Sequence, residues 1–266
     1  MTTAIVIPAR YASSRFPGKP LAPLVGATGV AKPLIQRSIE AARTVTGVDY
    51  LYVATDDARI ADAARACGTA VAMTPPECAN GTERVAAALA ELPDDVDIFV
   101  NFQGDALLTP ADLVERLIAH MIAHPDCEVA TVAVRCSPSA YAHLVADQAQ
   151  GRVGGTTVVC DAKGDALYFS KRVLPHITPG SPREATPPVL LHLGLYAYRR
   201  SALARYAALP ATDLEHIEGL EQLRFLYHGM AVAVVAADPP AWDAIELNNP
   251  SDGDPIEAIL ATRGLV

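Results

Sequence analysis

The sequence lacks the features that mark several classes of protein. It has no run of 18 apolar residues that could cross a membrane, and residues 1–20 contain no apolar segment of the kind found in signal peptides. Its five cysteines form no Cys-x-x-Cys pair, and an odd number does not suit a disulfide framework. We therefore expect a cytoplasmic protein with reduced thiols.

An excess of basic residues is also missing. The 266 residues carry a formal net charge of −9, which argues against a general affinity for nucleic acid, because such binding needs a basic face. The chain is 51% hydrophobic and 19% charged, so it has ample material for a core and no signature of disorder. Basic residues that cluster on such an acidic chain indicate a local anion site.

Such a cluster occurs in the loop at residues 8–20. The continuous apolar run at 4–7 predicts a buried parallel strand, and the prolines and glycine after it exclude helix and strand. The loop carries three cations and two hydroxyls, namely Arg10, Arg15, Lys19, Ser13 and Ser14. These groups suit a polyphosphate, because ligands of open α/β sheets bind beyond the carboxyl ends of the strands.

Two common phosphate-binding motifs are absent from this loop. Gly18-Lys19 is followed by Pro20 rather than by serine or threonine, so the segment is not a Walker loop, and no Gly-x-Gly-x-x-Gly fingerprint occurs here. A solvated basic loop without a ligand remains the alternative.

Strands and helices alternate from residue 3 to about 135. The apolar patterns predict further strands at 49–55, 70–73, 98–102 and 129–134, and helices at 32–44, 58–67, 81–92 and 110–124. Asp56 and Asp57 can cap the helix at 58–67, and Gly68 can end it. This alternation predicts an α/β fold with a parallel sheet and right-handed crossovers.

The pattern changes after residue 136. Residues 137–152 look irregular; strands are expected at 153–160, 166–170, 190–198 and 231–236, and helices at 199–208 and 217–228. We interpret 1–266 as one domain in which 137–230 is an inserted α+β region, a natural place for an acceptor pocket and a dimer contact.

Polar residues at strand ends are candidates for metal and nucleotide binding. Asp105 follows the strand at 98–102, and a carboxylate near a polyphosphate loop suits Mg²⁺; its alternative role as a helix cap is better filled by Thr109. Glu246 and Asn248 lie on one side of an extended segment and could reach a second metal site. Gly81 permits close approach of a base or ribose at a helix start, although an ordinary helix start fits as well.

Two further groups have a functional and a structural interpretation. Glu218, Glu221 and Gln222 lie within about one helical turn and should share a side, although from the spacing alone a solvated helix face explains them better. His192 and Tyr196 are four apart in a strand and should face the same way.

Motifs along nearly the whole chain resemble those of 3-deoxy-manno-octulosonate cytidylyltransferases, the CMP-KDO synthetases. They are I-P-A-R-Y-x-S-S-R-x-P-G-K-P-L at 7–21, V-A-T-D at 53–56, M-T at 73–74, G-T-E-R at 81–84, N-x-Q-G-D at 101–105, A-L-Y-F-S at 166–170, H-L-G-x-Y-x-Y-R at 192–199 and L-E-H-I-E-x-L-E-Q-L-R at 214–224. The resemblance implies a Rossmann-like, GT-A-like nucleotidyltransferase fold, a mostly parallel sheet with helices on both faces. It also implies a homodimer that transfers CMP from CTP to an anionic acceptor and releases pyrophosphate.

The same resemblance implies roles for individual residues. The nucleotide would be bound by Pro8, Ala9, Arg10, Ser13, Lys19, Met73, Thr74, Asn80, Gly81 and Gln103. Catalysis would depend on Arg15, Lys19 and Asp105. The acceptor would be bound by Arg15, Gln103, His192, Tyr196, Glu221 and Gln222. Mg²⁺ would be held by Asp105 together with Glu246 or Asn248.

Three departures from the family pattern leave the acceptor open. Ala106 replaces the glutamate of Q-G-D-E, Leu191 replaces the arginine of R-H-L-G, and Asn248 replaces the second metal aspartate. Trp242 and Asp243 also lengthen the preceding connection. The acceptor could be 3-deoxy-manno-octulosonate, another acidic sugar such as an amino-octulosonate, or a small phosphonate or phosphonoacid. A non-catalytic nucleotide sensor is the alternative from another class.

Overall fold

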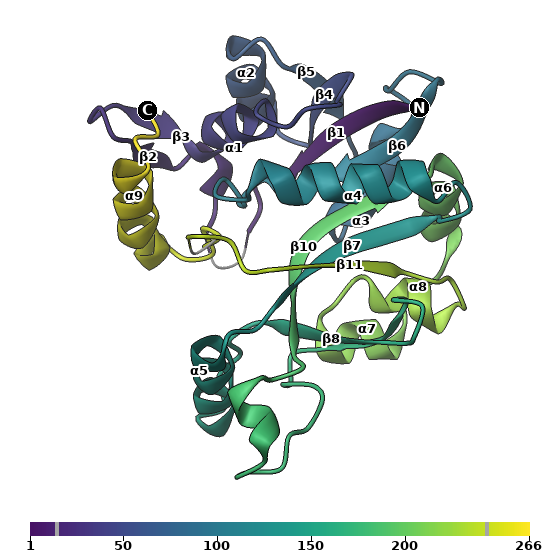
Figure 1. Ribbon diagram of the computed structural model, residues 1–266. Coiled ribbons are helices and arrows are strands. Elements are labelled where there is room, and N and C mark those ends of the chain that lie inside the picture. The colour runs from purple at the N-terminus through teal and green to yellow at the C-terminus, as the bar shows by residue number, and fades with distance from the viewer. Residues whose placement is uncertain (14–15, 243–244) are drawn as a thin grey trace. The chain divides into compact units, whose positions relative to one another are not determined.

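Strand β1 (Thr2–Ala9) organises the amino-terminal part of the computed structural model, which describes residues 1–13, 16–242 and 245–266 (Figure 1). The chain folds into two units, Met1–Ile118 with Pro240–Val266, and Ala119–Pro239. The predicted insertion at 137–230 lies entirely within the second unit.

The sheet of the first unit is parallel, as predicted. β1 lies between β4 (Tyr50–Thr55) and β6 (Val96–Asn101), and β5 (Ala70–Met73) pairs with the far side of β4 (Figure 1). Residues 4–7 of β1 point alternately to the two faces, and none has exposed surface. Both faces of β1 are therefore covered, which explains its continuous apolar run.

The helices of the first unit follow the strands along the chain. They are α1 (Leu34–Ala42), α2 (Ala58–Ala66), α3 (Gly81–Ala88) and most of α4 (Ala111–Ala123). The predicted cap of α2 is confirmed, because the Asp57 carboxylate accepts a hydrogen bond from Arg59 N at 2.9 Å. Gly68, with a φ of 68°, ends the segment as predicted.

The last 27 residues return to the first unit. Here β2 (Pro23–Val25), which forms a hairpin with β3 (Ala31–Pro33), shares a core cluster with α9 (Gly253–Thr262), the helix that follows the short η3 (Pro250–Asp252). The cluster includes Leu24, Leu108, Leu247 and Ile256. The Trp242 indole donates to the Leu108 carbonyl at 2.8 Å. Leu247 N donates to the Asp105 carbonyl at 3.3 Å, so the two segments predicted to bind metal lie together.

The second unit contains a mixed sheet. β7 (Val129–Arg135) pairs in parallel with β11 (Ala233–Ala237) and antiparallel with β10 (Leu190–Tyr198); β8 (Thr156–Cys160) pairs antiparallel with both β10 and β9 (Ala166–Ser170). The predicted α/β class and the mixed structure of the inserted region are thus confirmed, with β8 three residues shorter than expected.

Two predictions for the helices of the second unit are wrong. Residues 137–152 are not irregular, because α5 (Pro138–Ala149) forms there; its Ser137 cap accepts from Ala140 N at 3.1 Å, and Pro138 occupies the first turn. The helix expected at 217–228 is two helices, α7 (Asp213–Glu218) and α8 (Leu223–Tyr227), because Gly219 ends α7 with a φ of 61°. α6 (Arg200–Ala208) and the short η2 (Pro182–Ala185) complete this unit.

Candidate active site

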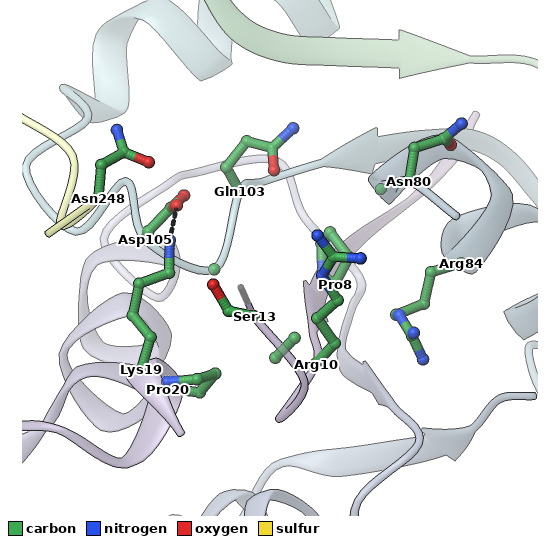
Figure 2. A pocket seen from close by; sticks show the side chains of 13 residues that line it. Pro8, Arg10, Ser13, Lys19, Pro20, Asn80, Arg84, Gln103, Asp105 and Asn248 are labelled. Carbon is green, nitrogen blue, oxygen red and sulfur yellow. Dashed lines mark hydrogen bonds and ion pairs between the residues drawn. The ribbon is translucent and has the colours of Figure 1, made fainter. Parts of the chain in front are cut away.

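A cavity of about 220 Å³ lies at the carboxyl end of β1 in the first unit (Figure 2). Its walls come from the loop after β1, the start of α3, the turn after β6 and the segment before η3. Most residues predicted to bind nucleotide line it, namely Pro8, Ala9, Arg10, Ser13, Lys19, Asn80, Gly81 and Gln103. The cavity thus joins four segments far apart in the sequence.

Gly104 explains why the turn after β6 can approach β1 so closely. A Cβ atom at this position would stand 2.6 Å from the Pro8 carbonyl oxygen, a distance that no side chain tolerates. The Gly104 carbonyl in turn accepts a hydrogen bond from Ser38 Oγ at 2.9 Å. The turn therefore holds Gln103 and Asp105 against the phosphate-binding loop.

Lys19 and Asp105 form an ion pair inside the cavity (Figure 2). Their side chains are 17% and 18% exposed, so both keep access to a ligand. Lys19 opens the short helix η1 (Lys19–Leu21), and Gly18 before it adopts a left-handed φ of 71°. The charged group of the loop is thus aimed at the carboxylate that we predicted to bind metal.

The residues present fit a magnesium ion by their donor chemistry. Asp105 and Asn248 both line the cavity and offer carboxylate and amide oxygens, and Mg²⁺ commonly takes few protein ligands and completes its shell with water and phosphate. Asn248 is held by a bond from its backbone N to Asp252 Oδ2 at 2.9 Å. Within the described ranges, no group of three or more histidine, cysteine, aspartate or glutamate residues could hold a metal.

Glu246, unlike Asn248, is not among the residues that line the cavity. Its carboxylate accepts a hydrogen bond from Asn248 Nδ2 at 3.3 Å. The structure therefore favours Asn248 over Glu246 as the residue that faces a ligand, with Glu246 orienting its amide.

The start of α3 forms the other end of the cavity. Asn80 caps this helix by accepting from Glu83 N at 2.8 Å, and a Cβ at Gly81 would stand 3.3 Å from Asn101 Nδ2. Both side-chain amide atoms of Asn101 are buried without a hydrogen-bond partner in the described part of the chain. Such an amide next to a ligand cavity is a place for a bound water or a ligand-induced contact.

Arg84 is a cavity residue that sequence reasoning missed. Its side chain is 2% exposed, donates to Thr74 Oγ1 at 2.6 Å and lies 3.5 Å from Asp56 Oδ2. Thr74 itself is buried and does not line the cavity, and its hydroxyl accepts this hydrogen bond from Arg84. The conspicuous arginine of G-T-E-R, one turn after Gly81, was the available signal.

The predicted acceptor residues other than Arg15 and Gln103 belong to the second unit. The rings of His192 and Tyr196 lie 5.3 Å apart, as expected for residues on one face of β10. Thr131 Oγ1 donates its only hydrogen to the Leu195 carbonyl at 2.7 Å, so His192 Nε2, at 2.9 Å, must donate to Thr131. Burial lowers the His192 pKa to about 3, and the neutral ring keeps Nδ1 as an acceptor.

The prediction that Glu218, Glu221 and Gln222 share one side of a helix is wrong. Gly219 separates them, and the Glu218 carboxylate accepts bonds from Tyr168 Oη, Ser170 Oγ and Lys171 N at 3.2, 2.8 and 3.1 Å. Glu218 therefore ties α7 to β9.

The segment from 219 to 222 keeps a group suited to a ligand. Gln222 is 2% exposed, and its Nε2 has no hydrogen-bond partner among the described residues. A buried amide donor without a partner is costly unless a ligand or water completes it.

A buried ion pair holds α7 to α8. Arg224 Nε and Nη2 donate to the two oxygens of Glu215 at 2.8 and 2.6 Å, and both side chains are under 10% exposed. Glu215 also completes a capping box with Thr212. The charge-dense motif at 214–224 thus contains structural residues, Glu215, Glu218 and Arg224, beside its predicted acceptor residues.

Two positions noted in the sequence have a different status. Leu191, where the family has arginine, packs against a buried cluster that includes Tyr141 and Leu144, so the departure is accommodated by apolar contacts. Arg15, predicted to be catalytic and acceptor-binding, lies outside the described residues. In the part of the chain that the structure covers, no helix is long and apolar enough to span a membrane.

Comparison with known proteins identifies the relatives of this chain. A family model described as cytidylyltransferase matches residues 4–232. A 3-deoxy-manno-octulosonate cytidylyltransferase of Maricaulis maris is 43% identical over 99% of both chains, and an 8-amino-3,8-dideoxy-manno-octulosonate cytidylyltransferase of Shewanella woodyi is 40% identical over 98% of this chain and 99% of its own. A solved structure of CMP:2-keto-3-deoxy-manno-octonic acid synthetase complexed with CTP superposes with a TM-score of 0.83, at 34% identity, and covers 99% of this chain and 100% of that one.

Proposed function

Because the chain belongs to the cytidylyltransferase family, it is a nucleotidyltransferase, and we propose that it transfers CMP from CTP to 3-deoxy-manno-octulosonate or a closely related acidic sugar. The observation that carries this proposal is the cavity at the end of β1. It unites the cations of the loop with Asp105 and Asn248, which is the arrangement that a metal-bound triphosphate requires.

The reaction needs positioning and charge neutralisation rather than a covalent protein intermediate. A hydroxyl of the acceptor attacks the α-phosphorus of CTP in line; a new P–O bond forms, and the bond to pyrophosphate breaks. Arg10, Ser13 and Lys19 donate to the phosphates and stabilise the departing pyrophosphate. For Arg15 the same role is proposed from the sequence alone. Gln103 and the amide nitrogens at the start of α3 hold the nucleoside, with Arg84 as an added cation.

Asp105 and Asn248 would hold magnesium, whose charge would offset that of the α-phosphate oxygens when bound. Lys19 forms an ion pair with Asp105, so the position of the Lys19 ammonium group depends on this carboxylate. Removing that carboxylate should therefore affect both the metal dependence and the placement of Lys19.

The second unit supplies groups for the acceptor. Gln222 offers a buried donor, and His192 offers Nδ1 as an acceptor beside Tyr196, with Glu221 adjacent to Gln222 in the chain. Paired donors and acceptors of this kind suit a sugar acid that carries hydroxyl and carboxylate groups. The relatives include enzymes named for the hydroxy and for the 8-amino sugar, so both belong in the test.

We also propose that the enzyme is a cytoplasmic homodimer. The five cysteines are all free, and burial raises the pKa of each thiol, which suits a reducing compartment. Light scattering of the purified chain tests the dimer; a monomeric mass at working concentration would contradict it.

Pyrophosphate release from CTP tests the function. The purified chain would receive CTP, Mg²⁺ and one acceptor at a time: 3-deoxy-manno-octulosonate, its 8-amino-3,8-dideoxy analogue, or a small phosphonate. We expect release with a sugar acid, loss of release with EDTA, and a preference for CTP over UTP. Release with the phosphonate alone would overturn the acceptor assignment, and CTP binding without release across all acceptors would overturn catalysis.

A further inference from the structure

Tyr11 belongs to the proposed phosphate-binding loop at 8–20 and lies between the cavity residues Arg10 and Ser13 in the sequence. Its carbonyl oxygen accepts a hydrogen bond from Gly18 N at 2.9 Å, which ties the first part of the loop to the residue before Lys19. Its ring lies against Gly18 as well, since a Cβ there would stand 3.0 to 3.2 Å from the outer ring atoms and the hydroxyl oxygen. Position 18 therefore requires glycine for two reasons: its φ is left-handed, and a side chain there would clash with the Tyr11 ring.

The other side of this contact is anchored to α2. The Arg59 guanidinium lies over the Tyr11 ring, with its carbon 3.5 Å from the ring centroid. Arg59 Nε and Nη2 donate to the two oxygens of Asp57 at 3.0 and 2.7 Å, and Asp57 caps α2. The fork of hydrogen bonds fixes the plane of the guanidinium and lowers the pKa of Asp57, so the pair stays charged.

We propose that Tyr11, held by Arg59 and Asp57, is a positioning residue that fixes Arg10 and Lys19 for the triphosphate. A loop rich in proline and glycine has few side chains of its own to hold it, and the stack of Tyr11 on Arg59 attaches the first part of the loop to α2. Preorganised donors bind phosphate better because the loop need not be ordered during binding. The inference rests on the proposed role of the loop in binding CTP.

Steady-state kinetics of Tyr11→Leu and Arg59→Ala would test the proposal. Cation–π pairs at exposed sites correspond to about a two- to five-fold change in affinity, so Arg59→Ala should raise the KM for CTP by about that factor. Tyr11→Leu should raise it at least as much, because it also removes the packing on Gly18. The KM for the acceptor and the thermal unfolding midpoint should stay at the wild-type values.

Conservative variants and a matched control separate positioning from general damage. Tyr11→Phe keeps the ring and should restore the KM for CTP, and Arg59→Lys should restore it in part. Arg65→Ala removes a cation from the same helix, with 55% exposure against 58% for Arg59 and its own partner Asp62, and should leave the KM unchanged. The double variant of Tyr11 and Arg59 should be no worse than Tyr11→Leu alone, since both act through one stack.

Two outcomes distinguish failure of the inference from failure of the proposed function. If Lys19→Ala loses activity while Tyr11→Leu and Arg59→Ala match Arg65→Ala, the positioning role is overturned and the loop keeps its function. If Lys19→Ala leaves the KM for CTP and turnover unchanged, the phosphate role of the loop itself is overturned.

Discussion

Replacing Glu215 by glutamine tests whether the buried ion pair of Glu215 and Arg224 in the motif at 214–224 stabilises the fold. The change removes the Glu215 charge beside the Arg224 guanidinium, which is 5% exposed, while two hydrogen bonds of 2.8 and 2.6 Å lose their ionic character. Breaking one side of a buried ion pair costs about 3–5 kcal/mol. An exposed pair is worth only about 0–1 kcal/mol, so Glu128→Gln, which disrupts the half-exposed pair with Arg205, is the matched control.

Urea unfolding is the appropriate assay, read by two probes. Far-UV circular dichroism follows the whole chain, whereas fluorescence of Trp242, the only tryptophan, follows the first unit. With a urea slope of about 2–3 kcal/mol/M, we expect Glu215→Gln to lower the dichroism midpoint by on the order of 1 M or more. The fluorescence transition should move less, since both partners lie in the second unit.

Function provides a second check on the same variant. Gln222 lies in the short segment between α7 and α8, which the pair holds together. The KM for the acceptor should therefore rise more than the KM for CTP. A double replacement of Glu215 and Arg224 by methionine should recover much of the lost stability, because both charges of the buried pair are then removed together. If Glu215→Gln is no more destabilising than Glu128→Gln, the conclusion that the Glu215–Arg224 pair stabilises the packing of α7 on α8 is refuted.

Three other perturbations address the cavity and His192. Gly104→Ala should lower the free energy of unfolding by about 1–3 kcal/mol and remove most of the activity, because the new Cβ would meet the Pro8 carbonyl oxygen. Gly253→Ala, whose Cβ would have its nearest neighbour at 3.9 Å, should be neutral. Equal stability of the two variants would contradict the close approach of Gly104 to Pro8. Lys19→Ala should lower kcat/KM on the order of 100-fold, and Asp105→Ala should abolish both turnover and its response to Mg²⁺. Both variants should keep the circular dichroism spectrum of the wild type. An Asp105→Ala variant that Mg²⁺ still activates would disprove the role of the carboxylate. Burial gives His192 a pKa of about 3 in the folded chain, against about 6.5 in the unfolded chain, so the unfolded chain binds more protons between these values. The free energy of unfolding should therefore fall as the pH drops below 6.5, by up to about 1.4 kcal/mol per pH unit. His192→Phe should flatten this slope between about pH 6.5 and 5, and parallel curves for the variant and the wild type would contradict the burial of a neutral His192.

Local signals in the sequence were sufficient for the elements that depend on local chemistry. The continuous apolar run of β1, the acidic cap of α2 and the strands at 166–170 and 190–198 were all predicted within a few residues. These features follow from side-chain period, capping and turn residues that lie within a few positions of one another. The phosphate-binding character of the loop was visible for the same reason, because its cations and glycine are neighbours in the chain.

Tertiary structure decided what depends on distant residues. Only the fold brings Asn248 to Asp105, places a Cβ-free residue at 104 against Pro8, and buries Arg84 beside Thr74. Conversely, Glu218 is the last residue of α7, and the spacing groups it with Glu221 and Gln222, but its carboxylate accepts hydrogen bonds from Ser170 of β9 and from Lys171. Spacing predicts which side chains can share a face; which of them meet a ligand and which meet another strand depends on long-range packing, which the sequence does not display locally.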